Sequence, residues 1–457
     1  MIRLWLAVWM SRLAGWASRL TGRGGSSLPG VVARRIDPRV LSRLTARLPQ
    51  GAVLLTGTNG KTTTSALTAH LLRARGWRVI HNHAGANLIL GLTAAMTQAA
   101  RCRIYPRADV ALLETDEATM SRASLETRPR AVLVTNFFRD QLDRYGELST
   151  TVAFAARGIA SLAEDGWLVL NADDPQVAQL GAGLRRVVYY GLAMPSPDGA
   201  SDYQAVDAQF CPRCGQSLTY QRRFFAHLGW YECEPCGWRR PHPDLAVERW
   251  NRAAGEVEFD WRGHRLRLPW QLPGLYNLYN LAAAAAMALT MGMVPEQVEA
   301  ALQNFRPAFG RMEPVRMDGA TVWLALVKNP VGFNQVLQAV SEEPGFKVAV
   351  LLINDRYADG QDVSWLWDVD FEGWVGRTGI AAWWVGGIRA RDMAVRLKYA
   401  GVAESAITIA EDPEKAFASA RQAFPAATTY VLPTYTALLE IRRYLARRGH
   451  VRHFREG

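Results

Sequence analysis

The chain has 457 residues, of which 49% are hydrophobic and 21% are charged. This composition excludes a disordered tail, a fibre and a small disulfide-stapled scaffold, and the length suggests two to four domains. The net charge of +11 lies at the two ends, because residues 1–50 contain nine Arg and one Asp and residues 441–457 contain six Arg and one Glu. The basic ends therefore fit an anionic surface or an acidic partner better than sequence-specific recognition of nucleic acid.

Residues 1–20 predict an amphipathic helix. One stripe of the helical wheel holds Trp5, Trp9, Leu13, Trp16 and Leu20, with Arg12 and Arg19 beside it. The apolar run is too short for a membrane span, which needs about 18 apolar residues, and it lacks the features of a signal peptide. The favoured interpretation is a helix docked on its own domain, and the alternative is an interfacial helix that rests on anionic lipid.

A glycine loop between a strand and a helix predicts a phosphate-binding site. Residues 51–56 predict a buried strand, Gly57-Thr-Asn-Gly60-Lys61-Thr62-Thr63-Thr64 follows, and the apolar period of residues 66–72 predicts a helix. At such a loop, backbone N–H groups and the helix N-terminus approach the phosphates, Lys61 offsets their charge, and the Thr62 hydroxyl is placed to hold Mg²⁺. The predicted phosphate-binding residues are Gly57, Thr58, Asn59, Gly60, Lys61, Thr62 and Thr63.

Strand and helix patterns alternate after this loop. The next expected strands are Trp77–His81, Val110–Leu113, Ala131–Thr135 and Trp167–Leu170. A doubly wound sheet binds its ligands beyond the carboxyl ends of the strands, where acidic and amide residues follow the last three of these strands. We expect Glu114 to be a second Mg²⁺ contact across from Thr62, and the alternative is a solvated loop acid.

Four cysteines have the spacing of a metal site. Cys211, Cys214, Cys233 and Cys236 form a C-x2-C-x18-C-x2-C pattern, which predicts a structural Zn²⁺ with all four positions filled by thiolates. A linker rich in Pro, Ser, Asp and Gly at 194–210 leads into this ribbon, which we expect as an insertion at about residues 205–243. Two disulfides are the weaker alternative without a signal peptide, and Cys102 is left as an inert thiol.

The later part of the chain predicts a second, smaller α/β domain. Polar strands at Val257–Leu268 lead to Gly274-Leu-Tyr-Asn277-Leu-Tyr-Asn280 and a long Ala-rich helix. From Thr321 a new alternation begins, with strands expected at Val322–Val327, Lys347–Ile353, Ile380–Val385 and Tyr430–Leu432. We therefore expect a basic amphipathic segment at 1–48, a nucleotide-binding domain at 49–320 and a C-terminal α/β domain at 321–457.

Six motifs in this order resemble the Mur ligase family of ATP-dependent amide-forming enzymes. They are GTNGKTTT at 57–64, Glu114, TNFFRDQLDRYG at 135–146, NADDP at 171–175, GLYNLYN at 274–280 and Gly310-Arg311. The resemblance implies a P-loop ATPase domain of Mur ligase type, here with the inserted zinc ribbon, followed by a smaller Rossmann-like α/β domain. It also implies ATP at the glycine loop and at Asn280, Mg²⁺ at Thr62 and Glu114, and Arg311 near the phosphates. Gln141 stands where many members have the His of Asp-His-Leu-Asp.

One subgroup, the MurT subunits of lipid II isoglutaminyl synthases, is similar from end to end. The shared features are the Trp- and Arg-rich start, the inserted ribbon, and the segments 328–334 and 354–365. This resemblance implies ATP-dependent amidation of the α-carboxylate of D-glutamate in the lipid II stem peptide to D-isoglutamine, through an acyl phosphate. It also implies a heterodimer with the glutaminase subunit GatD, which supplies ammonia, and a catalytic role for Asp362 in orienting the glutaminase His. By itself, the acidic loop that contains Asp362 predicts a solvated segment or a weak cation site.

The cysteine content supports a partner independently of the resemblance. Glutamine hydrolysis needs a nucleophilic thiol beside a His, and Cys102 does not lie in a Gly-x-Cys-x-Gly elbow. Two alternatives remain: a stand-alone Mur-type amino-acid ligase, and a zinc-ribbon ATPase that binds nucleic acid, against which the nearly neutral middle of the chain argues. We expect no nucleic-acid partner and a cytoplasmic protein that meets lipid II at the membrane surface, with attachment at the inner face of the plasma membrane left open.

Overall fold

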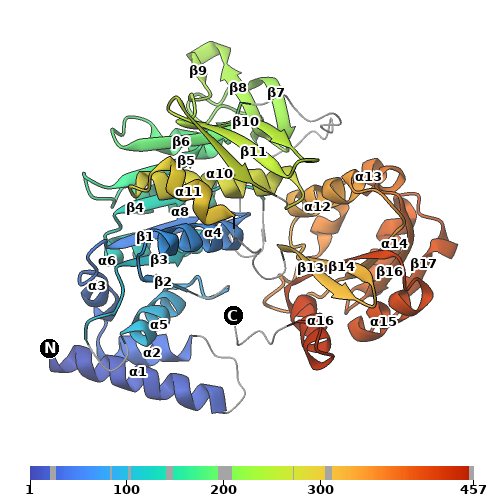
Figure 1. Ribbon diagram of the computed structural model, residues 1–457, viewed down its shortest axis with the longest axis horizontal. Coiled ribbons are helices and arrows are strands. Elements are labelled where there is room, and N and C mark those ends of the chain that lie inside the picture. The colour runs from blue at the N-terminus through green and yellow to red at the C-terminus, as the bar shows by residue number, and fades with distance from the viewer. Residues whose placement is uncertain are drawn as a thin grey trace. The chain divides into compact units, whose positions relative to one another are not determined.

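The computed structural model describes residues 1–20, 27–82, 85–100, 104–139, 148–193, 208–270, 272–303 and 311–451 (Figure 1). The chain divides into two compact units. The first contains Met1–Phe138, Glu147–Gln271 and Asn277–Phe305. The second contains Arg139–Gly146, Leu272–Tyr276 and Arg306–Gly457.

A nine-stranded sheet organises the first unit, in the order β12-β11-β10-β6-β5-β4-β1-β3-β2. The strands are β1 (Ala52–Thr56), β2 (Val79–His81), β3 (Val110–Glu114), β4 (Ala131–Val134), β5 (Trp167–Asn171), β6 (Val187–Leu192), β10 (Leu245–Asn251), β11 (Glu256–Trp261) and β12 (His264–Pro269). Pairing is parallel from β2 to β10, and β10, β11 and β12 are antiparallel. The strands expected from the sequence are confirmed, and their continuous apolar runs are typical of parallel strands that are covered on both faces.

In the described ranges, three helices precede β1, and the others alternate with or follow the strands of this sheet. They are α1 (Ile2–Leu20), α2 (Leu28–Ile36), α3 (Val40–Thr45), α4 (Lys61–Ala74), α5 (Ile89–Ala99), α6 (Glu117–Thr127), α8 (Leu148–Ile159), α9 (Pro175–Ala178), α10 (Leu275–Thr290) and α11 (Pro295–Leu302). Helix α4 begins at the last residues of the glycine loop, directly after β1. The central strand β1 pairs with both β3 and β4, so the segments that follow these two strands flank the loop on either side.

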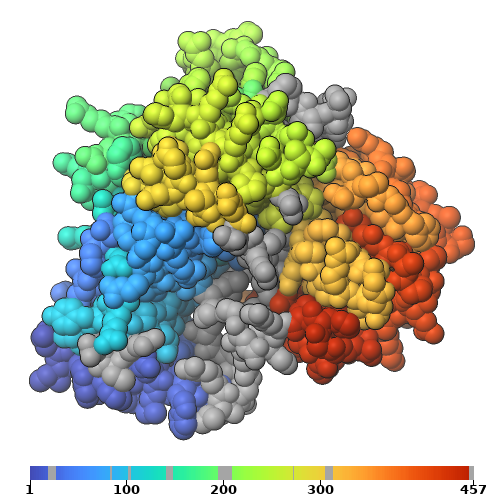
Figure 2. Space-filling model, in the orientation of Figure 1, coloured from blue at the N-terminus to red at the C-terminus, as the bar shows by residue number. Residues whose placement is uncertain are grey.

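Helix α1 docks on its own unit through a face that the helical wheel did not predict. The buried side chains are Leu4, Ala7, Val8, Ser11 and Ser18, and α1 packs against α2 and α5. Trp5, Trp9, Leu13 and Trp16 of the predicted stripe are instead 41–58% exposed, and the Leu20 side chain lies outside the described residues. In the space-filling view, α1 lies at the edge of the first unit (Figure 2). Among the described residues, no helix is long and apolar enough to cross a membrane.

The four-cysteine segment forms a small sheet of its own within the first unit. Strands β7 (Thr219–Phe225), β8 (Leu228–Cys233) and β9 (Trp238–Arg239) are antiparallel neighbours. The segment leaves the large sheet after β6 and returns at β10, and β6 and β10 are paired with each other. It is therefore an insertion that the large sheet does not need for its own continuity, and it lies at the end of the unit remote from α1 (Figure 1).

The second unit contains a six-stranded sheet in the order β13-β14-β18-β15-β16-β17. Its strands are β13 (Arg311–Met317), β14 (Ala320–Ala325), β15 (Lys347–Leu352), β16 (Ile380–Gly386), β17 (Ile407–Ile409) and β18 (Thr428–Pro433). Its helices are α12 (Pro330–Glu342), α13 (Phe371–Thr378), α14 (Ala390–Tyr399), α15 (Pro413–Ala423) and α16 (Tyr435–Arg447). Strand β13 begins before residue 321, where we expected the second domain to start, and it belongs here because it is the antiparallel partner of β14.

Candidate functional site

The glycine loop between β1 and α4 has the backbone shape of a phosphate-binding loop. Gly57 and Gly60 both have positive φ, at 125° and 82°. A Cβ at Gly60 would lie 2.1 Å from Asn280 Oδ1, so this position requires glycine both for its backbone conformation and for the approach of α10. The N-terminus of α4 follows immediately, which adds the positive end of a helix dipole to the loop.

Lys61 is buried at the first residue of α4. Its ammonium donates to Glu117 Oε1 at 2.9 Å, to the carbonyl of Gly57, and to the carbonyl of Thr58 at 3.3 Å. Burial by itself lowers the pKa of Lys61, but the carboxylates of Glu117, Asp116 and Glu114 outweigh burial and hold this pKa above its ordinary value. The ammonium therefore stays charged, and the phosphates of a nucleotide would compete with Glu117 for it.

The structure brings Thr62 and Glu114 together. The Thr62 hydroxyl donates to Glu114 Oε1 at 3.3 Å, and Ser65 Oγ lies 3.5 Å from Glu114 Oε2. Glu114 is only 3% exposed, so it is not a solvated loop acid. Hydroxyl and carboxylate oxygens are the donors that Mg²⁺ prefers, and the pair suits such an ion beside the loop. Their role as Mg²⁺ ligands stays a prediction.

Asn280 reaches the same loop from α10. Its Oδ1 accepts a hydrogen bond from Thr64 Oγ1 at 3.2 Å, and its Nδ2 donates to Asn277 Oδ1 at 3.2 Å. The position of Asn280 is compatible with its predicted contact to a nucleotide, which stays a prediction. Three other residues singled out from the sequence cannot be placed: Gln141, Cys102 and the side chain of Arg311 lie outside the described residues.

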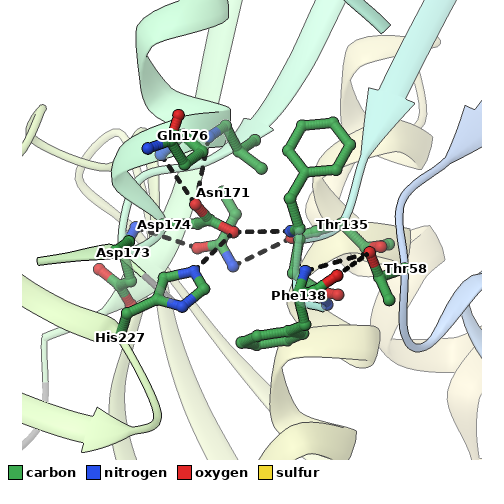
Figure 3. A network of polar contacts seen from close by, with 12 residues as sticks. Thr58, Thr135, Phe138, Asn171, Asp173, Asp174, Gln176 and His227 are labelled. Atoms are coloured by element: carbon green, nitrogen blue, oxygen red, sulfur yellow. Dashed lines mark hydrogen bonds and ion pairs between the residues drawn. The ribbon is translucent and has the colours of Figure 1, made fainter. Parts of the chain in front are cut away.

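A segment after β4 supports the loop from the other side. The backbone N–H of Thr58 donates to the carbonyl of Asn136 at 2.8 Å, and the N–H of Asn59 donates to Asn136 Oδ1 at 2.8 Å. The Thr135 hydroxyl donates to the carbonyl of Asn59 at 2.8 Å. Figure 3 shows Thr58 facing Phe138, whose N–H donates to Thr58 Oγ1 at 3.1 Å. The loop is therefore held by its neighbours as well as by its own glycines.

The four cysteines form one cluster. Cys211 Sγ lies 3.7 Å from Cys236 Sγ, Cys214 Sγ lies 3.4 Å from Cys233 Sγ, and all four sulfurs lie within 4.8 Å of one another. Four thiolates at about 2.3 Å from a tetrahedral Zn²⁺ stand about 3.8 Å apart, so the cluster fits this ion. The backbone N–H of Trp238 lowers the pKa of Cys236 to about 7, whereas burial raises the pKa of Cys211 and of Cys233. A bound metal ion would favour the thiolate form of all four cysteines.

In the second unit, Asp362 is an exposed carboxylate between β15 and α13. Hydrogen bonds from the hydroxyl and the backbone N–H of Ser364 lower the pKa of Asp362, and the N–H to Oδ1 distance is 2.8 Å. An ionised carboxylate at the surface can accept a hydrogen bond from a group outside the chain.

The other aspartates of the acidic loop have separate structural contacts. Asp359 is buried and accepts from the N–H and the hydroxyl of Thr436 at 2.7 and 2.6 Å, and Asp355 pairs with Arg389 at 2.7 Å. Within the described ranges, the four cysteines are the cluster of three or more His, Cys, Asp or Glu side chains that could hold a metal, and these aspartates do not belong to it. The weak cation site considered for this loop therefore has no support in the structure.

Comparisons with known proteins place this arrangement in a family. The Mur ligase middle domain matches residues 55–222, and the MurT ligase C-terminal domain matches residues 326–438. The chain is 33% identical over 452 residues to the lipid II isoglutaminyl synthase (glutamine-hydrolyzing) subunit MurT of Staphylococcus aureus strain N315, with 98% of each sequence covered. It is 35% identical over 440 residues to the subunit of the same description from Streptococcus pneumoniae, with 95% of each covered. The chain belongs to the MurT family of Mur ligases.

Solved structures agree with this assignment at the level of the fold. A pseudomurein peptide ligase type C from Methanothermus fervidus has a TM-score of 0.69 at 22% identity, over 90% of this chain and 81% of that one. A MurF ligase from Thermotoga maritima in complex with ADP has a TM-score of 0.64 at 15% identity, over 91% and 85%. The Mur ligase fold expected from the sequence is thus confirmed, and as a MurT-family member this chain is an ATP-dependent ligase of peptidoglycan synthesis.

Sequence reasoning missed two residues of this MurT-family site. Glu117 holds the Lys61 ammonium, and Asn136 holds the backbone of the glycine loop. The signal for Glu117 was its place three residues after Glu114, at the start of a helix whose first turn faces the loop. The signal for Asn136 was its place as the second polar residue after β4, at the sheet edge where β1 ends.

The cysteine cluster gives a direct prediction. Cys233→Ser should lower the zinc content well below one ion per chain and lower the melting temperature, because a structural zinc contributes its binding free energy to folding. Elemental analysis and thermal unfolding of the purified chain measure both quantities. Cys102→Ser is the control, since it leaves the four-cysteine pattern intact. Wild-type protein that contains no stoichiometric zinc when purified without a chelator would contradict the prediction.

Proposed function

We propose that this chain is the ligase subunit of a lipid II isoglutaminyl synthase. In this proposal it uses ATP to convert the α-carboxylate of D-glutamate in the lipid II stem peptide to the amide of D-isoglutamine. The observation that carries the proposal is the glycine loop with Lys61 beside the Thr62–Glu114 pair, in a chain that matches MurT subunits over 95–98% of its length.

The proposed chemistry has two steps. A carboxylate oxygen of the substrate attacks the γ-phosphorus of ATP, the bond from that phosphorus to the bridging oxygen breaks, and ADP leaves an acyl phosphate behind. The nitrogen of ammonia then attacks the carbonyl carbon, inorganic phosphate leaves, and the nitrogen loses a proton. The loop amides and Lys61 hold the phosphates in line, and Thr62 and Glu114 would hold Mg²⁺, which offsets the charge on the transferring group.

The nitrogen source in this proposal is a second chain. The four cysteines of the cluster are the free thiols within the described part of the chain, and metal binding would occupy all of them. The MurT relatives are described as subunits of a glutamine-hydrolyzing enzyme, which implies a glutaminase partner. We propose that this partner is GatD, in a heterodimer, and that Asp362 orients its catalytic His from the second unit.

The two alternatives have less support. Among amino-acid ligases, the UDP-N-acetylmuramoylalanine–D-glutamate ligase of Pelotomaculum thermopropionicum is 28% identical over only 269 residues, or 58% of this chain and 47% of that one. That match falls well short of the end-to-end match to MurT subunits. A nucleic-acid-binding ATPase has only the basic ends and the ribbon in its favour.

A variant of Asp362 distinguishes glutamine hydrolysis from amide formation. Asp362→Asn should slow glutamine hydrolysis by the complex roughly 10³–10⁴-fold, because an amide cannot fix the His tautomer as a carboxylate does. High ammonium bypasses the glutaminase and should restore isoglutamine formation from lipid II to the wild-type rate. The measurements are glutamate release and isoglutamine formation by the purified pair of chains, with glutamine or with ammonium.

The control for this experiment is Asp368→Asn, which changes an exposed carboxylate of the same segment. Asp359 is unsuitable because it is buried against Thr436. If ammonium fails to rescue Asp362→Asn in an assembled complex, Asp362 belongs to the ligase half. If wild-type chains with lipid II, ATP and ammonium form no amide, the proposed function is wrong.

We also propose that α1 attaches the protein to the inner face of the plasma membrane, where a lipid-linked substrate would lie. The helix is docked by its opposite face, so its exposed apolar side chains are accessible to a lipid surface. Residues 1–36 contain six Arg and no acidic residue. Arg34 is paired with Glu126 of the same unit, and the remaining positive charge complements an anionic lipid surface. Three exposed Trp side chains on such a helix are typical of interfacial membrane binding.

Vesicle binding tests this attachment. The complex should co-sediment with phosphatidylglycerol vesicles more than with phosphatidylcholine vesicles, and less at high salt because the charges are screened. The triple variant Trp5→Ser/Trp9→Ser/Trp16→Ser should bind at least about tenfold more weakly, since it loses the apolar area that lipid would cover. The matched control Leu125→Ser/Leu184→Ser removes exposed apolar side chains elsewhere on the first unit. Equal binding by the triple variant and the wild type would contradict the attachment.

A further inference from the structure

The hairpin of the four-cysteine module is buried at its tip. Residues 224–229, at the turn between β7 and β8, are all buried, and His227 is 1% exposed. At the other end of the hairpin, Cys214 and Cys236 of the cluster are exposed. The module therefore buries its tip against the rest of the first unit, whereas two of its four cysteines are exposed and two, Cys211 and Cys233, are buried. A module that only covered the surface would not need a buried tip.

The tip contacts the segment that follows β5. The backbone N–H of Gly229 donates to the carbonyl of Asp173 at 2.9 Å, and the Tyr231 hydroxyl donates to the carbonyl of Ala172 at 3.0 Å. His227 Nε2 lies 3.4 Å from Asp174 Oδ2 (Figure 3). The module thus contacts two adjacent aspartates, Asp173 through its carbonyl and its pairing with Arg240, and Asp174 through His227.

Asp174 connects this contact to the glycine loop. The same Oδ2 atom accepts the backbone N–H of Phe137 at 2.8 Å, and the His227 ring packs on the Phe138 ring at a centroid distance of 4.8 Å. Phe138 N–H in turn donates to Thr58 Oγ1, as Figure 3 shows. Two or three direct contacts therefore lead from His227 to a residue of the predicted phosphate-binding loop.

A second route runs through α10. Phe225 at the tip packs edge-on against Tyr279 at 5.6 Å, and Tyr279 directly precedes Asn280. Asn280 is the residue that approaches Gly60 and accepts from Thr64. The tip thus contacts both segments that hold the loop, one after β4 and one at the start of α10.

The His227 side chain is a buried polar ring, which is unusual for a residue that only fills space. Within the part of the chain that the structure describes, neither ring nitrogen has a hydrogen-bond partner. A buried polar atom without a hydrogen bond costs roughly 1–3 kcal/mol, so an apolar ring of similar size would fill this space at lower cost. The Nε2 atom nevertheless approaches Asp174 Oδ2 to 3.4 Å, a polar contact that an apolar ring could not make.

We propose that the hairpin tip of the four-cysteine module positions the nucleotide-binding loop, with His227 as the positioning residue that acts through Asp174 and residues 136–138. The inference rests on the proposed function in one respect, namely that this loop binds the nucleotide. It assigns the inserted module a role in nucleotide affinity in addition to any contribution to folding.

The first test is nucleotide binding by His227→Phe in the full chain assembled with its glutaminase partner. The variant keeps a ring against Phe138 and removes the contact with Asp174. Calorimetric titration with ADP and Mg²⁺ should give a Kd roughly tenfold higher than for the wild type, within the usual range of coupling between sites. The KM for ATP should rise, the KM for ammonium should stay the same, and zinc content should stay at the wild-type level.

The control variant and the possible outcomes distinguish a failure of this inference from a failure of the proposed function. Thr219→Ala changes an exposed residue of the same hairpin and should leave the Kd for ADP unchanged. A folded His227→Phe chain with full zinc and a Kd within about twofold of the wild type would overturn the inference and leave the proposed function standing. A wild-type complex that does not bind ADP would overturn both.

A second measurement needs no variant. Coupling between two sites is reciprocal, so ADP with Mg²⁺ should slow amide hydrogen exchange at the β7–β8 tip in the wild-type complex. Peptides that cover residues 219–233 should gain protection, and peptides from α1 should not. Exchange at the tip that is unchanged at saturating ADP would overturn the inference even if His227→Phe does not fold.

Discussion

The buried ammonium of Lys61 is the constraint on which the organisation of the first unit depends. A charge taken out of water costs several kcal/mol unless partners replace its hydration, so the first turn of α4 can be buried only where acceptors converge. Glu117 at the start of α6 and the carbonyls of the loop supply them. Because β1 pairs with β3 and β4, the segments after both strands reach the loop, and α10 closes it at Asn280.

Buried charged groups and their partners also hold the inserted module. Asp173 is fully buried, and it accepts from the Tyr279 hydroxyl at 2.7 Å and pairs with Arg240 near the end of the module. Burial raises the pKa of Asp173 above its ordinary value, although Arg240 opposes this shift. One aspartate thus fixes the module and α10, and the next one fixes the segment that holds the glycine loop. The module and the glycine loop therefore depend on a single pair of adjacent carboxylates.

The buried strands, the glycine loop and the cysteine cluster could be predicted from the sequence, because each depends on residues that are close together in the chain. Apolar runs in β1, β3, β4 and β5 predict buried parallel strands, and the glycine loop and the cysteine spacing carry their own geometry. The docking face of α1 could not be predicted in this way. The helical wheel weighs the large apolar Trp residues, whereas the docking face of α1 combines Leu4 and Val8 with small residues. A Cβ at Gly15 would lie 2.8 Å from Gln98 Nε2, and Ser11 Oγ lies 2.7 Å from Thr97 Oγ1. A close helix–helix contact favours small residues such as Gly and Ser, and a hydrophobicity pattern gives these residues little weight.

The roles of Glu117, Asp174 and His227 could not be predicted either, because each depends on a contact between segments far apart in the chain. His227 lies 53 residues after Asp174, on an insertion whose spacing indicates only a metal site. Asp362 and Asp359 carry the same charge three residues apart, and only the fold distinguishes the exposed carboxylate from the one buried against Thr436.

The central claim is that the glycine loop activates a carboxylate by phosphoryl transfer, and oxygen-isotope transfer tests it most directly. The substrate is lipid II with ¹⁸O in the α-carboxylate of D-glutamate, and the nitrogen donor is ammonium. The account predicts that each amide formed releases inorganic phosphate that carries one ¹⁸O atom from the carboxylate, because the acyl phosphate breaks at its carbonyl carbon. Amide formation with ¹⁸O in AMP, or with unlabelled phosphate, would contradict the account.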